Sequence, residues 1–137
     1  MDRRLITTTS YKREVQALRP MVDTETLKSR FYGKQELLEK VYYEFSVFVE
    51  TALPEMQKAH ESGDLKSLAQ KAHTLKGNSA LIGAGRVNEL AVDIQQASNA
   101  GDVHVLNSAL PQLFDQVQDT VQELKRFVFD EPLTGGR

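Results

Sequence analysis

The 137-residue sequence contains no cysteine and no tryptophan. Without cysteine the chain cannot form a disulfide framework or a thiolate metal site, and this composition is typical of proteins from a reducing compartment. Basic residues are not in excess either, because 17 lysines and arginines stand against 19 aspartates and glutamates. We therefore expect no nucleic-acid partner, since such partners require a basic surface.

Long apolar runs are also missing. No stretch approaches the roughly 20 apolar residues that a membrane span requires, and the first ten residues, MDRRLITTTS, lack the apolar core of a signal peptide. We therefore expect a cytoplasmic protein without membrane insertion. Hydrophobic residues make up 40% of the chain, and its length suits one domain with a core and is too short for two.

Apolar residues recur at steps of three and four, which predicts four amphipathic helices over residues 35–60, 65–82, 87–98 and 103–127. Gly63-Asp64 and Gly101-Asp102 each provide a glycine that can end one helix and an aspartate that can cap the next. The run from Gly83 to Gly85 is predicted to close the second helix. Pro54 is predicted to kink or break the first helix, and Pro111 to bend the last helix or delay its start.

Such short connections predict an all-α fold in which the helices are antiparallel neighbours, an up-down-up-down four-helix bundle. No strand pattern competes with it. A short helix capped by Asp23, and a weaker one over residues 11–18, are expected to cover one end of the bundle. Residues 1–20 are expected to form a partly flexible or helical extension, and residues 130–137 a flexible tail.

His73 is predicted to point away from the core. The apolar positions of the helix over 65–82 centre on Ala72 and Ser79, and His73 lies roughly 120° from that direction. Small or basic residues surround it on this flank: Lys66, Ala69, Lys76, Gly77 and Ala80. A glycine inside a helix costs about 1 kcal/mol relative to alanine, and it is typical of places where another molecule approaches the backbone. We interpret Gly77 as such a place, beside a histidine that another protein's active site must reach.

An exposed imidazole can act as a base, a metal ligand, a nucleophile or a pH sensor. The sequence shows no nucleophile elbow, phosphate loop or suggestive carboxylate pair to support a base, and no HExxH to support zinc. A nucleophilic nitrogen that accepts a phosphoryl group fits best, with Lys76 supplying positive charge. Because no nucleotide-binding motif is present, the phosphoryl group must come from another protein. The chain is therefore interpreted as a phosphocarrier without autonomous kinase activity.

The motif His-x-Leu-Lys-Gly at residues 73–77, followed by Ser79 and by Gly83-Ala84, resembles the histidine-containing phosphotransfer (HPt) domain of multistep two-component phosphorelays. The similarity extends over about residues 21–128, so residues 21–129 are expected to form the HPt bundle. The resemblance implies that His73 accepts a phosphoryl group from a receiver-domain aspartate and passes it to another receiver. It also implies receiver domains of response regulators and hybrid histidine kinases as partners of a monomeric chain. The receiver would supply Mg²⁺, so no cofactor or metal of the chain's own is expected.

The same resemblance implies roles for four residues. His73 would carry the phosphoryl group on Nε2, and Lys76 would lie beside the phosphoryl oxygens. Gly77 would give clearance for the magnesium-loaded pocket of the receiver. Gln95 occupies the place of a glutamate or glutamine that hydrogen-bonds Nδ1 in the family and fixes the ring tautomer, which leaves Nε2 as the nucleophile.

Two alternatives remain open. The motif is close to that of the phosphorylatable N-terminal domain of chemotaxis-type histidine kinases, in which ATP is the donor through a separate kinase domain. A non-phosphorylated helical adaptor that binds receiver domains is the other alternative. Label transfer from a phosphorylated receiver would separate the phosphocarrier from the adaptor, which would bind without becoming labelled.

Overall fold

A computed structural model of the chain describes residues 21–130, and all of its regular elements are helical. They are α2 (Thr24–Arg30), α3 (Gln35–Ser62), α4 (Leu65–Leu81), α5 (Gly85–Ala100), α6 (Val103–Lys125) and a final π-helical turn, η1 (Arg126–Asp130). The expected all-α class is confirmed for this part of the chain. The helix expected at residues 11–18, with the rest of the N-terminal extension, lies outside the described residues, as does the tail after residue 130.

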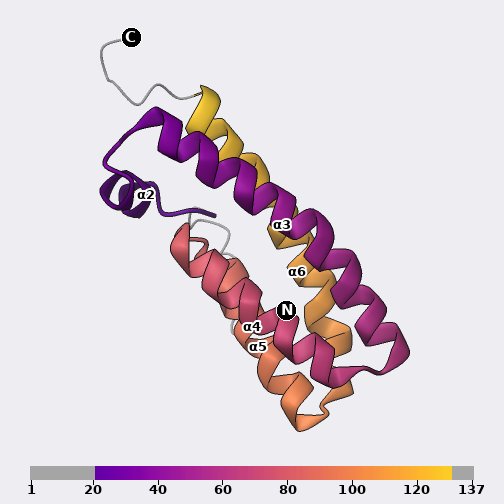
Figure 1. Cartoon of the computed structure of the whole chain (residues 1–137). Coiled ribbons are helices and arrows are strands. Elements are labelled where there is room, and N and C mark those ends of the chain that lie inside the picture. The colour runs from indigo at the N-terminus through magenta and orange to yellow at the C-terminus, as the bar shows by residue number, and fades with distance from the viewer. Residues whose placement is uncertain (1–20, 131–137) are drawn as a thin grey trace, which may run out of the picture.

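The four long helices enclose one hydrophobic core. Helix α3 packs against α4 and α6, and α5 packs against the same two helices, so the pairings close a ring. Figure 1 shows these helices lying alongside one another along most of their length. The largest fully buried side chains are apolar and come from α2, from each of the four long helices and from the segments beside them: Val22, Leu27, Leu38, Met56, Leu68, Leu75, Ile82, Ile94, Leu106, Leu110, Leu113 and Leu124. Burial of these faces holds the helices at fixed positions relative to one another.

Both glycine-aspartate junctions behave as the sequence predicts. Gly63 and Gly101 adopt left-handed backbone conformations, with φ of 75° and 71°, and end α3 and α5. The carboxylates of Asp64 and Asp102 then accept hydrogen bonds from first-turn amides of α4 and α6, each at 3.1 Å. Each pair of residues therefore ends one helix and begins the next within two positions.

Three expectations are wrong: a break at Pro54, a late start of the last helix at Pro111, and the role of Gly85. Helix α3 runs unbroken through Pro54, and α6 begins at Val103, eight residues before Pro111. Both prolines are exposed, and so are Glu50 and Asn107, the residues four positions earlier, so water can reach the carbonyls that lose their partner. The third error concerns Gly85, which is the first residue of α5 and does not close α4.

Helix α2 is attached to the end of the bundle where α4 gives way to α5 (Figure 1). The backbone amide of Asp23 donates to the carbonyl of Gly83 at 3.0 Å. The Asp23 side chain caps α2, because the hydroxyl and the amide of Thr26 both donate to its carboxylate, and these bonds hold the pKa of that carboxyl below its ordinary value. Asp23 thus joins the start of α2 to the turn that follows α4.

Arg30 makes a second connection at the same end. Its Nη1 donates to the carbonyls of Ala80 and Leu81, at 2.8 and 2.7 Å. Carbonyls at the end of a helix have no partner within the helix, and a cation is favourable there. Arg30 therefore caps α4 from outside and holds the helix that carries His73.

We expect Gly83→Ala to destabilise the protein by about 2–4 kcal/mol, a typical range for strain combined with overpacking. Gly83 has φ of +71°, and a Cβ atom there would lie 2.9 Å from Cβ of Asp23 and 3.2 Å from its backbone nitrogen. Urea unfolding followed by circular dichroism measures the loss. The matched control is Gly63→Ala, because Gly63 has φ of +75° and open space around the new methyl group. Equal losses in both variants would contradict a packing cost at Gly83.

Candidate functional site

His73 lies in the middle of α4 and is exposed to solvent, as the helical periodicity predicts. Its neighbours Ala72 and Leu75 are fully buried, so the helix is held with its apolar stripe inward and the imidazole outward. Rotation of α4 about its axis would take these side chains out of the core. The direction of the histidine is therefore set by the packing of the bundle.

The imidazole stands in an open groove between α4 and α5 with a volume of about 760 Å³. Apart from His73 and one lysine, its lining residues are uncharged: Leu65, Lys66, Ala69, Gln70, His73, Thr74, Gln95, Ser98 and Asn99. The groove gives a protein partner access to one side of the ring. Gln70, Thr74, Ser98 and Asn99 were not identified from the sequence, because polar residues on a helix surface give no pattern that separates a groove from an ordinary solvated face.

Gln95 on α5 contacts the ring of His73. Nε2 of its side-chain amide lies 3.3 Å from Nδ1, so the structure brings together the two residues that the sequence analysis paired across 22 positions. In this orientation the amide donates and Nδ1 accepts, which places the proton of a neutral ring on Nε2. A half-turn of the amide presents Oε1 in its place and favours the other tautomer, with the proton on Nδ1. Among residues 21–130, no side chain hydrogen-bonds Nε2 of His73.

The two lysines near His73 are placed differently. Lys66, two turns before the histidine, lines the groove with it. Lys76 is half-buried and is not among the groove-lining residues. Its carbonyl accepts hydrogen bonds from Nδ2 of Asn88 at 2.9 Å and from Oγ of Ser79 at 3.0 Å, so α5 holds the backbone next to Gly77. The contact with Asn88 was not foreseen, because a side chain that bonds a helical carbonyl in another helix leaves no periodic signal.

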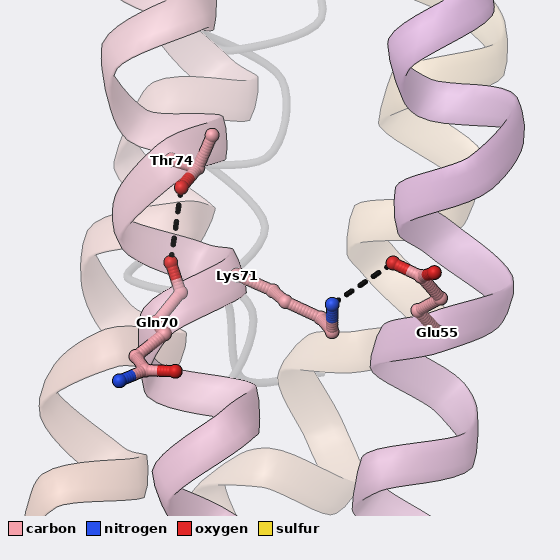
Figure 2. Close-up of polar contacts among 4 residues, drawn as sticks. All are labelled: Glu55, Gln70, Lys71 and Thr74. Atoms are coloured by element: carbon pink, nitrogen blue, oxygen red, sulfur yellow. Dashed lines mark hydrogen bonds and ion pairs between the residues drawn. The ribbon is translucent and has the colours of Figure 1, made fainter.

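Acidic side chains lie away from this groove. On α5, Glu89 and Asp93 line a separate groove with side chains of α6. On the other side of α4, Nζ of Lys71 forms an ion pair of 2.9 Å with Glu55 of α3 (Figure 2). The described lining of the His73 groove therefore contains no carboxylate, and an incoming phosphoryl group meets no fixed negative charge there.

Figure 2 also shows a polar contact within α4. The hydroxyl of Thr74 donates to the carbonyl of Gln70 at 3.2 Å, so it is directed along the helix. Both residues are exposed. The hydroxyl next to His73 is thus occupied by the backbone of its own helix.

Gly77 is exposed one turn after His73, and a Cβ atom built on it would meet no atom within 4 Å. No packing inside the bundle therefore requires a glycine at this position. Its helical backbone does not require one either, because its φ is not positive. What the glycine provides is free space on the outer surface, next to the imidazole.

Within residues 21–130, no group of three or more histidine, aspartate or glutamate side chains is arranged to hold a metal ion. In the same part of the chain, no helix combines the length and apolarity that crossing a bilayer would require. Of the four site residues named from the sequence, His73, Lys76 and Gly77 lie within two turns of α4, and Gln95 of α5 contacts His73.

Comparison with known proteins identifies a family over most of the chain. Residues 41–127 match the Hpt domain family, a span that includes His73, Lys76, Gly77 and Gln95. The chain is similar to the phosphorelay intermediate protein rdeA of Dictyostelium discoideum, with 26% identity over 105 residues, which cover 77% of this chain and 41% of that protein.

A second similarity is to the multistep phosphorelay regulator 1 of Schizosaccharomyces pombe, with 32% identity over 62 residues. That match covers 45% of this chain and 21% of the yeast protein. The chain therefore aligns with less than half the length of either relative. No solved structure matches the chain.

Proposed function

The chain belongs to the Hpt domain family, and from this premise we propose that it is a phosphorelay intermediate in which His73 is the phosphoryl acceptor. It takes the phosphoryl group from the aspartyl phosphate of one receiver domain and passes it to the aspartate of another. The observation that carries the proposal is the setting of His73: an exposed imidazole that lines the groove, with Nδ1 in contact with Gln95 and no side-chain hydrogen bond to Nε2 among the described residues.

The transfer exchanges one high-energy bond for another. The lone pair of Nε2 attacks the phosphorus of the acyl phosphate, the N–P bond forms, and the bond between phosphorus and the aspartate oxygen breaks. The attacking ring carries its proton on Nδ1, and the oxygen of the Gln95 amide accepts a hydrogen bond from it. Because both phosphoryl compounds have similar transfer potential, the reaction runs in either direction. The chain needs no nucleotide site for this reaction.

The receiver supplies Mg²⁺ and the in-line geometry, and this chain supplies position and charge. Lys66 lines the groove, and Lys76 lies one turn after His73; both are cations that favour an incoming phosphoryl group. In this proposal the Lys76 ammonium lies beside the phosphoryl oxygens, and Gly77 leaves the space through which the receiver approaches the ring. A monomer suffices, because every residue invoked comes from one chain.

We also propose that the helices alternate in direction, as an up-down-up-down antiparallel bundle. Two-residue junctions between α3 and α4 and between α5 and α6, and three residues between α4 and α5, support this arrangement. Connections of this length join neighbours of opposite direction. In such a bundle α4 is supported along its length by α3 and α5, so the imidazole is presented on a rigid element.

Incubation with a phosphorylated receiver domain and Mg²⁺ tests the function. We expect the phosphoryl label to move onto this chain and to be stable in alkali and labile in acid, which is the behaviour of phosphohistidine. A second receiver added afterwards should remove the label. Binding of several phosphorylated receivers without any label transfer would overturn the proposal in favour of an adaptor. Labelling only through a histidine kinase and ATP would favour the chemotaxis-type alternative.

A further inference from the structure

The contact between Gln95 and His73 has two possible forms, because a glutamine amide carries both a donor and an acceptor. Nε2 of Gln95 lies 3.3 Å from Nδ1 of the ring in the structure. The torsion that rotates the amide has broad, roughly two-fold preferences, so a half-turn replaces the NH₂ group with the oxygen without moving the rest of the side chain. Gln95 can therefore bond Nδ1 whether or not that nitrogen carries a proton.

Nδ1 needs both kinds of partner during one cycle of transfer. When Nε2 attacks, Nδ1 is protonated and requires an acceptor. Once the N–P bond has formed, the ring is a cation until Nδ1 loses its proton to solvent, and Nδ1 of the neutral phosphohistidine then requires a donor. The N–P bond breaks readily only after Nδ1 is protonated again, because neutral imidazole is a far better leaving group than imidazolate.

We propose that Gln95 controls the lifetime of the phosphorylated protein by turning its amide between these two forms. With NH₂ directed at Nδ1, as in the structure, Gln95 stabilises the neutral phosphohistidine and slows its hydrolysis. With oxygen directed at Nδ1–H, it stabilises the protonated ring that attacks the acyl phosphate and that releases the phosphoryl group to the next receiver. This inference rests on the proposed function, since it concerns the phosphorylated form of His73.

No charged side chain described near His73 replaces Gln95 as the partner of Nδ1. The charged groups near the ring are cations of α4, Lys66 in the groove and Lys76 one turn away. On α5, Glu89 and Asp93 line the opposite groove, and Ser98 and Asn99 beside His73 are uncharged. On α3, the carboxylate of Glu55 is paired with Lys71 of α4.

The test uses potassium phosphoramidate as a small-molecule phosphoryl donor, which labels histidine without any receiver. Hydrolysis of the phosphoprotein is followed between pH 5 and 9 by ³¹P NMR in the wild type and in Gln95→Ala and Gln95→Glu. A glutamate accepts but cannot donate, so it keeps Nδ1 protonated. We expect Gln95→Glu to hydrolyse about tenfold faster near neutral pH, the effect of a one-unit change in proton affinity. Gln95→Ala loses both the donor and the acceptor, so its hydrolysis rate should lie between those of the wild type and Gln95→Glu.

The matched control is Gln96→Glu, which places the same change of charge on the adjacent exposed residue of α5. It should leave the hydrolysis rate unchanged. The ¹⁵N shifts of the ring in the phosphorylated protein give a second readout, because the pH at which Nδ1 protonates should be higher in Gln95→Glu than in the wild type. A merely structural role of Gln95 would not move it.

Identical hydrolysis profiles and ¹⁵N shifts in the wild type and both Gln95 variants would overturn the lifetime control. This failure is distinct from failure of the proposed function, because phosphoramidate tests the lifetime without a receiver. A protein labelled by phosphoramidate at His73 but by no phosphorylated receiver would contradict the relay and leave the lifetime result standing.

Discussion

Replacement of His73 by glutamine is expected to abolish phosphoryl transfer, with a loss of at least about 1000-fold, because the variant has no nucleophilic nitrogen at this position. The fold should be retained. His73 is exposed and lies outside the apolar stripe of α4, so the free energy of unfolding should change by no more than about 0.5 kcal/mol. The measurement is the rate at which label moves from a phosphorylated receiver, combined with urea unfolding of the same variant.

The other described histidines provide the control. His104 is exposed near the start of α6, and Nε2 of His60 lies 3.0 Å from Oδ1 of Asn107 between α3 and α6. Neither residue lines the groove that contains His73. Their glutamine variants should accept label at the wild-type rate. Label retained in His73→Gln, or lost in His104→Gln, would place the phosphoryl acceptor elsewhere.

Substitutions at Gly77 are expected to affect the stability of the protein and the rate of phosphoryl transfer differently. Alanine at this position should stabilise the protein by about 1 kcal/mol through its helix propensity, because the new methyl group meets no atom of the bundle. Gly77→Leu should also fold, since leucine forms helices well and the site is open. The same open side is where the receiver must approach the ring, so we expect Gly77→Leu to slow transfer about 100-fold, the cost of displacing reacting groups by roughly 1 Å.

Three measurements check this prediction: urea unfolding, the rate of transfer from a phosphorylated receiver, and labelling by phosphoramidate. The small donor needs little clearance, so it should label Gly77→Leu at nearly the wild-type rate. A loss with both donors would show that the leucine disturbs His73 itself. Transfer from the receiver at the wild-type rate would contradict the role of Gly77 as a clearance for the partner.

The sequence predicted the helices well where physical signals are local. Asp64 and Asp102 cap their helices as expected, because an N-cap bond joins residues three positions apart. The same local reasoning allowed a break at Pro54, but α3 continues without one. Propensity treats proline as a breaker, but the penalty falls when the carbonyl that it leaves unpaired faces water and the rest of the helix is held by tertiary contacts.

Prediction of the site was possible in part. The periodicity of α4 places His73 on the solvent side. Lys76 and Gly77 were identified as site residues because they belong to the same motif at residues 73–77. Gln95 was found only through the resemblance to a family, since no periodicity within a helix says which side chain of another helix reaches the ring. Asn88, which holds the carbonyl of Lys76, carried no signal at all.

The sequence alone determined that this chain is helical and that the imidazole of His73 stands outside its core, because both properties depend on contacts within one or two helical turns. Only the tertiary structure decided which face of α5 meets α4. That packing puts the Gln95 amide against Nδ1, gathers mostly uncharged side chains around the ring, and turns the acids of α5 toward α6. The physical reason is that helix rotation is set by burial of apolar surface across the whole bundle, which no local pattern records.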